Sequence, residues 1–174
     1  VISVFDLDSY EFINDIIISE KTEKYGRDMH HMNDLWAHGD YLYVSLFSHS
    51  GNVPNSIYDG GVLQVSLEDY SVRHKLIKDA WMPHSVTFIG GELYYLDSMR
   101  SKLLRGDKQV IGEFAGFLRG LAFDGQFFFV GESESRYFDR LAGVRNYISL
   151  TGGFYMFDEH SKAGRFYNLP TRQV

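Results

Sequence analysis

The chain has 174 residues and a formal net charge of −6, because 23 Asp and Glu outnumber 17 Lys and Arg. This balance lacks the basic footprint of a phosphate-binding surface, so we expect no nucleic-acid partner. The absence of cysteine excludes disulfides and thiolate metal sites. No apolar run approaches the length of about 20 residues that spans a bilayer, so we expect a soluble protein with no membrane partner. The favoured compartment is the cytoplasm.

The composition predicts an all-β fold of short strands. Aromatic residues make up 16% of the chain and suit a pleated, half-buried surface, and 17 glycines suit many tight turns. A first hairpin is expected within residues 4–18. Strand–turn–strand segments follow at residues 33–44, 84–95 and 119–130, with outer hairpins between and after them at residues 61–77, 102–114 and 152–168.

The three strand–turn–strand segments are copies of one pattern. Their turn glycines are Gly39, Gly90 and Gly125, and these coincide when the copies are stacked. A repeat of roughly 40 to 50 residues made only of strands is typical of a β-propeller. In that fold the first strand of each blade starts beside one central channel. The residues that open the copies are therefore expected to face one another.

Each copy, taken with the outer hairpin after it, forms one four-stranded blade. The expected blades cover residues 31–78, 82–114 and 117–169, and a remnant at residues 1–20 supplies the outer half of a fourth. The remnant is included because residues 5–12 superpose on residues 65–72. Residues 1–174 then form a single partial propeller, an incomplete ring, since closed rings have typically 4 to 8 blades. Missing upstream blades, or another chain in an oligomer, are the expected partners for its open edges.

Five short motifs point to one family. They are His31-x-Asn33-Asp34, Asp59-Gly60-Gly61-Val62, Met82-Pro83-His84-Ser85, Leu96-Asp97-Ser98 and Gly116-Phe117-Leu118-Arg119-Gly120-Leu121-Ala122-Phe123. With these motifs the chain resembles the uncharacterised bacterial propeller family known as domain of unknown function 4915. The resemblance runs from about Phe5 to about Leu169 and corresponds to the C-terminal part of the family's longer domain. It implies a propeller fold and no particular activity.

The favoured function is a binding or interaction module that recognises a small polar or anionic ligand at the channel mouth. The candidate binding residues are Asn33, Asp34, His84, Ser85 and Arg119. The planar guanidinium of Arg119 can hold a carboxylate or phosphate with two hydrogen bonds. A structural ion pair of Arg119 with Asp34 or Asp97 is the alternative interpretation.

The competing function is a metal-dependent hydrolase of the lactonase type, in which a divalent cation polarises a carbonyl or activates water. The candidate metal ligands are Asn33, Asp34, Asp97 and Glu132. The alternative for Asp97 and Glu132, placed beyond the second strands of adjacent blades, is that they are acids of a turn or of the solvent rim. His31 and His84 are the candidates for acid–base catalysis, and the alternative is a histidine hydrogen-bonded to a neighbouring blade.

Two further expectations concern the surface. Five histidines fall in turns, loops or outer strands and are expected to be exposed: His30, His38, His49, His74 and His160. Residues 133–150 form an insertion that is long for a hairpin connection, and it has room either to act as a lid or to be a decorative loop.

Overall fold

The computed structural model describes residues 1–137, 139 and 149–171. In this part of the chain nearly all regular structure is β, as the composition predicts. The strands are β1 (Ile2–Phe5), β2 (Phe12–Ile16), β3 (Met32–His38), β4 (Tyr41–Leu46), β5 (Gly60–Ser66), β6 (Val72–Ala80), β7 (Pro83–Ile89), β8 (Glu92–Asp97), β9 (Lys102–Arg105), β10 (Gln109–Glu113), β11 (Phe117–Phe123), β12 (Phe128–Ser133), β13 (Gly153–Phe157) and β14 (Gly164–Asn168). A short helix α1 (Lys21–Tyr25) and a 3-10 turn (Val53–Asn55) complete the elements. None of the helices in the described residues has the length and apolar character needed to cross a membrane.

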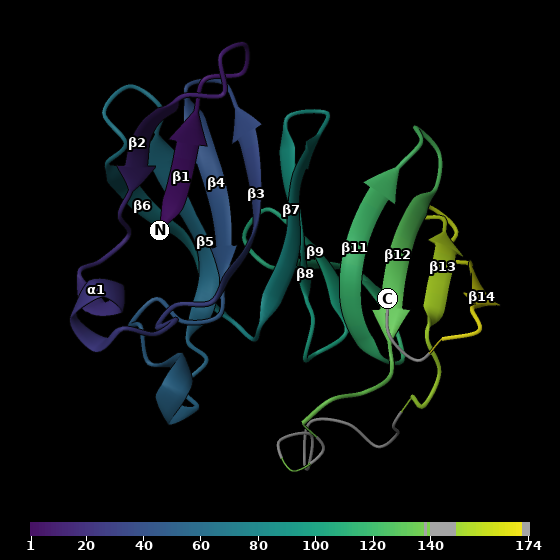
Figure 1. Cartoon of the computed structure of the whole chain (residues 1–174). Coiled ribbons are helices and arrows are strands. Elements are labelled where there is room, and N and C mark those ends of the chain that lie inside the picture. Colours follow the sequence, from purple (N-terminus) through teal and green to yellow (C-terminus); the bar gives the residue numbers. More distant parts are fainter. Residues whose placement is uncertain (138, 140–148, 172–174) are drawn as a thin grey trace.

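The strands form one two-stranded and three four-stranded antiparallel sheets. The N-terminal hairpin is β1–β2, and the first, second and third sheets are β3–β6, β7–β10 and β11–β14. Each four-stranded sheet is a meander in which strands that follow one another in the chain are paired. The first strands of the three sheets meet, because β7 contacts both β3 and β11 (Figure 1).

The N-terminal hairpin has the same turn as two of the outer hairpins. The residue that opens the turn donates its backbone N–H to a carbonyl five residues later, as Asp6 does to Glu11 (2.8 Å), Ser66 to Ser71 (2.9 Å) and Asp158 to Ala163 (2.8 Å). The residue before the closing position has a positive φ, which is 58° at Tyr10, 58° at Tyr70 and 59° at Lys162. The turn between β1 and β2 is thus similar to the turns that join the third and fourth strands of the first and third sheets.

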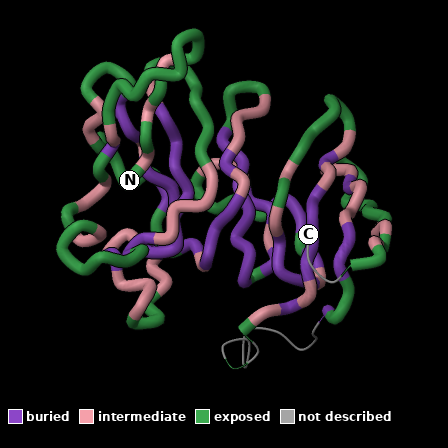
Figure 2. Tube along the Cα trace, in the orientation of Figure 1, coloured by how far each residue is buried: buried purple, intermediate pink, exposed green. Residues whose placement is uncertain are grey.

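Hydrophobic clusters fill the spaces between successive sheets. Because side chains alternate along a strand, β4 packs on both of its faces. Leu42 and Val44 pack with Ile16 of the N-terminal hairpin, whereas Tyr43 packs with Tyr95 of the second sheet. Strand β8 alternates in the same way and packs Tyr94 and Leu96 against Phe128 and Val130 of β12. Figure 2 shows the buried stretches along the middle strands and exposed chain at the turns.

Two of the five histidines that were expected to be exposed are not on the surface. His30 is only 5% exposed, and its Nδ1 lies 2.8 Å from the carbonyl oxygen of Ser48. His49 is half-buried, and its Nε2 lies 2.7 Å from the carbonyl oxygen of Ile77. The prediction is wrong for these two because the loop after β4 packs against the chain around it: its Ser48 contacts His30, and its own His49 lies against Ile77 of β6. It is confirmed for the remaining three, His38, His74 and His160, which are exposed.

Candidate functional site

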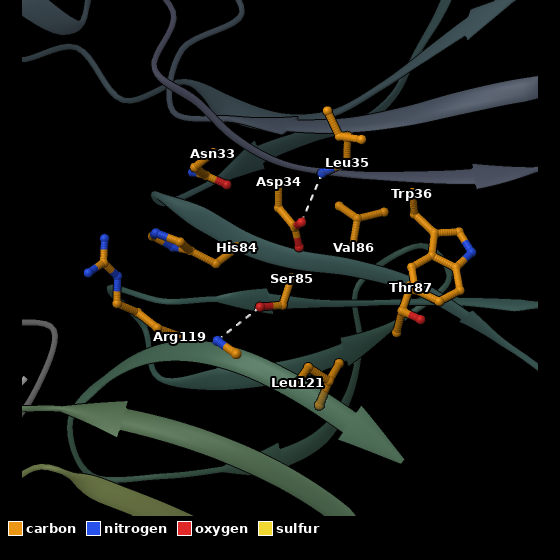
Figure 3. Close-up of a pocket in the computed structure, with 11 residues that line it drawn as sticks. Asn33, Asp34, Leu35, Trp36, His84, Ser85, Val86, Thr87, Arg119 and Leu121 are labelled. Carbon is orange, nitrogen blue, oxygen red and sulfur yellow. Dashed lines mark hydrogen bonds between the residues drawn. The ribbon is translucent and has the colours of Figure 1, made fainter. Parts of the chain in front are cut away.

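The first residues of β3, β7 and β11 line one cavity with a volume of about 600 Å³. Its walls are Asn33–Trp36 from β3, His84–Thr87 from β7 and Arg119–Leu121 from β11 (Figure 3). The structure therefore brings together all five candidate binding residues, which are Asn33, Asp34, His84, Ser85 and Arg119. They meet because the three copies open at the same position of three adjacent strands.

A β-bulge interrupts each of these strands at the cavity. The register shifts lie between Met32 and Asp34, between His84 and Thr87, and between Leu118 and Leu121. Two residues of the bulges have a positive φ, 57° at Ser85 and 75° at Gly120. Bulges re-orient side chains and free backbone groups from the ladder. This explains how neighbouring residues of each strand, instead of alternate ones, contribute to one cavity.

Polar side chains connect the three strands across the cavity. Asn33 donates from Nδ2 to the carbonyl of Pro83 at 2.9 Å, and the hydroxyl of Ser85 accepts the backbone N–H of Gly120 at 3.0 Å. Burial raises the pKa of Asp34, and hydrogen bonds from the backbone N–H groups of its neighbours partly oppose that rise. These bonds hold the cavity wall in one arrangement.

His84 is a neutral imidazole with one free nitrogen. It is 6% exposed, and its Nδ1 lies 3.1 Å from the carbonyl oxygen of Met82 and 2.8 Å from the hydroxyl of Ser98. Since a carbonyl only accepts, we assign the proton to Nδ1, which leaves Nε2 as an acceptor. Among the described residues Nε2 has no hydrogen-bond partner. Burial, reinforced by the charge of Arg119, lowers the pKa of His84 to about 4.

Two arginines lie near His84, Arg119 and Arg136. The guanidinium groups of Arg119 and Arg136 both lie over the ring of Phe117, at 6.0 and 5.5 Å from its centre. Burial, and then the charge of Arg136, lower the pKa of Arg119. Within the described part of the chain no acid forms an ion pair with either arginine.

The alternative ion pairs of Arg119 with Asp34 or Asp97 are therefore not formed. Asp97 pairs instead with Arg100, whose Nη1 lies 2.7 Å from Oδ2. Sequence reasoning missed Arg136 as a neighbour of the cavity. The available signal was the group of arginines in the long insertion after β12. The possible lid in that insertion, at 138 and 140–148, lies outside the described residues.

Asp97 and Glu132, the candidate metal ligands whose alternative was a place in a turn or at the solvent rim, are buried, so the solvent-rim alternative is wrong. Asp97 is 3% exposed and Glu132 is 1% exposed. They occupy corresponding places at the ends of β8 and β12, where Asp97 accepts the backbone N–H of Trp81 at 3.1 Å and Glu132 accepts that of Ala115 at 3.0 Å. Each carboxylate thus fixes the loop that enters its own sheet, and neither lines the cavity.

The candidate metal ligands divide between two places. Asn33 and Asp34 are at the cavity, whereas Asp97 and Glu132 bind backbone N–H groups. Across the described residues, no group of three His, Asp or Glu side chains is arranged to hold a metal ion. His31, the second candidate for acid–base catalysis, does not line the cavity and contacts Asp28, with its Nδ1 2.9 Å from the carboxylate.

Fold and cavity define an all-β protein with a polar site where three sheets meet. The family described as Domain of unknown function (DUF4915) matches residues 17–162, most of the chain, so the protein belongs to this family. The resemblance found in the sequence motifs is confirmed. No curated protein and no solved structure gives a significant match. Since the family has no assigned function, any function must be argued from the site.

Proposed function

We propose that the protein is a partial β-propeller that binds a small anionic ligand at the cavity between β3, β7 and β11. Three successive four-stranded meanders, with their first strands adjacent, support the propeller arrangement. The N-terminal hairpin, whose turn matches those of the outer hairpins, supplies half of a further blade. The cavity volume of about 600 Å³ suits a small molecule, since ligand sites span about 300–1,000 Å³.

The observation that carries the proposal is the pair of arginines that have no carboxylate partner in the part of the chain that the structure describes. Arg119 and Arg136 share one face-on neighbour, Phe117, and their charges repel. An anion between or beside them would remove that repulsion and accept charge-assisted hydrogen bonds. His84 is neutral near pH 7, so the positive charge beside the anion comes from the arginines.

The test is a titration of the protein with acetate and with inorganic phosphate. Binding is monitored through the NMR chemical shifts of the backbone amides of Ser85 and Gly120. Both anions are expected to shift these amides. Arg119→Ala is expected to weaken binding at least tenfold and to leave thermal unfolding unchanged. A tenfold change corresponds to about 1.4 kcal/mol, the smallest loss expected for a charge-assisted hydrogen bond.

The matched control is Arg73→Ala, which removes an arginine that pairs with Asp69 away from the cavity. It is expected to leave anion binding unchanged. Equal affinity in Arg119→Ala and the wild type, or no binding of either anion, contradicts the proposal. A loss of folding in Arg119→Ala would instead assign this arginine a structural role. Calorimetry with calcium, zinc and manganese addresses the hydrolase function, which requires a bound divalent ion.

The same architecture predicts a partner for strand β1. Strands β5, β9 and β13 each pair on both sides, whereas β1 pairs only with β2 among the described residues. Large apolar side chains of this hairpin are exposed, with Phe5 at 57% and Phe12 at 58%. An unpaired edge of this kind recruits a further strand. We expect an antiparallel strand of the same fold, from adjoining blades or from another copy, to occupy it.

Sedimentation velocity tests this partner. Since the chain has a mass of 20.1 kDa, the purified chain is expected to sediment as a larger particle. An oligomer would identify another copy as the source of the strand, and a companion polypeptide would identify a separate chain. A monomer that stays soluble at high concentration contradicts the expectation.

A further inference from the structure

The two ends of the cavity differ in chemistry, and the difference restricts the class of anion. Arg119 and His84 form what we term the arginine end, and Trp36 and Thr87 form the tryptophan end (Figure 3). Asp34 lies between them. We infer that the ligand is an acidic saccharide, a sugar ring that carries one carboxylate. This inference rests on the proposed function, because it assumes that an anion binds at the arginine end.

Asp34 argues against a ligand with several negative charges. Its carboxylate lines the cavity and accepts backbone N–H groups, among them that of Leu35 at 2.9 Å. A second anionic group of the ligand would lie near this carboxylate and be repelled. A hydroxyl group would instead donate a hydrogen bond to it. The cavity therefore favours one negative charge at the arginine end and hydroxyl donors in the middle.

Besides the carboxylate of Asp34, His84 has a hydrogen-bond acceptor, Nε2, to which no described residue donates. Its Nε2 is unprotonated in the tautomer assigned above and has no partner among the described residues. A buried acceptor without a partner is destabilising. Because Nε2 itself is not exposed, a ligand hydroxyl reaches it only after the ring turns toward the cavity, and a second carboxylate would not satisfy it, because a carboxylate only accepts. The exposed acceptor at Asp34 and this buried one both favour hydroxyl donors over further anionic groups.

Trp36 supplies an aromatic platform at the other end. It is 42% exposed although it lines the cavity, and its neighbours in the wall include Val86 and Leu121. An exposed large aromatic side chain in a polar cavity is typical of a ligand contact. The apolar face of a sugar ring can cover the indole while the hydroxyl groups at its edge remain free to hydrogen bond.

The experiment compares four probes that separate these features. D-Glucuronate has a carboxylate, a ring and hydroxyls; D-glucose lacks the carboxylate; cyclohexanecarboxylate lacks the hydroxyls; acetate has the carboxylate alone. The titrations use the Trp81→Phe variant, in which Trp36 is the only remaining tryptophan. Binding is measured by calorimetry and by Trp36 fluorescence. D-Glucuronate is expected to bind at least tenfold more tightly than each other probe and to change the fluorescence.

Two variants sharpen the test. Trp36→Ala is expected to weaken D-glucuronate about tenfold and to leave acetate unchanged, and Trp36→Phe is expected to restore most of the affinity. If cyclohexanecarboxylate or acetate binds as tightly as D-glucuronate, the saccharide inference fails and the anion site stands. If D-glucose binds as tightly as D-glucuronate, or no probe binds, the proposed anion site itself fails.

Discussion

The buried carboxylates and the arginines at the cavity differ in their hydrogen-bond partners. The carboxylate oxygens are hydrogen-bonded within the protein, whereas the arginines have no acidic partner among the described residues. Glu132 accepts the backbone N–H of Ala115 with one oxygen and the hydroxyl of Ser149 with the other, both at 3.0 Å. Asp97 likewise uses both oxygens. Arg119 lines the cavity and Arg136 lies next to it, and neither has a carboxylate partner among the described residues. Within the same residues, Nε2 of His84 has no hydrogen-bond partner.

The comparison separates residues that maintain the fold from residues available to a ligand. A buried acid whose oxygens are all hydrogen-bonded stabilises the chain segments that it joins. A cation or acceptor left without a partner adds no such stability and is free to bind. Sequence reasoning had grouped Asp97 and Glu132 with the possible metal ligands. Their hydrogen bonds instead assign them a structural role, because Asp97 accepts from the backbone of Trp81 and from Arg100, and Glu132 accepts from the backbone of Ala115 and the hydroxyl of Ser149.

The largest effect is expected on the structural side. Glu132→Ala leaves the N–H of Ala115 without its acceptor, and it leaves the hydroxyl of Ser149 with only the longer contact to Thr151, whose carbonyl oxygen lies 3.4 Å away. The free energy of unfolding is expected to fall by about 3 kcal/mol in chemical denaturation. Glu113→Ala is the control, because Glu113 is 63% exposed and pairs with Lys102 at the surface. It is expected to change stability by less than about 0.5 kcal/mol. Similar small effects in both variants would remove the distinction between the two regions.

The second prediction concerns the pH dependence that His84 imposes. Its pKa is about 4 in the folded protein against an ordinary value of 6.5, so between these values the unfolded chain binds a proton that the folded chain does not. Stability therefore falls as the pH drops from 6.5 to 4. The loss is on the order of 3 kcal/mol, at about 1.4 kcal/mol for each pH unit.

The check compares the pH dependence of unfolding in the wild type and in His84→Gln. Arg119, His31 and Arg136 also act on the imidazole, and the difference between the two proteins isolates the contribution of His84. The variant is expected to lose less stability than the wild type across this range. Identical slopes would mean that His84 has an ordinary pKa and is not the neutral acceptor described above.

The smallest effect on stability is expected from a hydrogen bond in the cavity wall, in which the hydroxyl of Ser85 accepts the N–H of Gly120. Ser85→Ala removes the acceptor of the Gly120 N–H, which is exposed to water, so unfolding is expected to become easier by about 1 kcal/mol. Ser3→Ala, which removes an exposed hydroxyl bonded to Asp15, is the control and is expected to change less. If Ser85→Ala has no effect on stability but abolishes anion binding, Ser85 belongs with the ligand-binding residues instead.

Much of the local structure followed from the sequence. The turn glycines, such as Gly39 and Gly90, have a positive φ that few other residues adopt readily, so their positions mark where strands end. The internal alignment of the copies also placed Asn33, His84 and Arg119 at one cavity. This worked because equivalent residues of equivalent strands meet when the first strands of the sheets are adjacent.

The tertiary structure decided which polar side chains are buried and which groups they hydrogen-bond. Whether Asp97 and Glu132 face solvent depends on loops that precede their sheets, and no local pattern records those contacts. Arg136 reaches Phe117 because the chain after β12 passes back beside the start of β11. The free nitrogen of His84 depends on Met82 and Ser98 occupying the other one. The sequence by itself determined strands, turns and their alignment, which depend on local backbone preferences, whereas charge, exposure and hydrogen-bond partners depend on segments brought together only by folding.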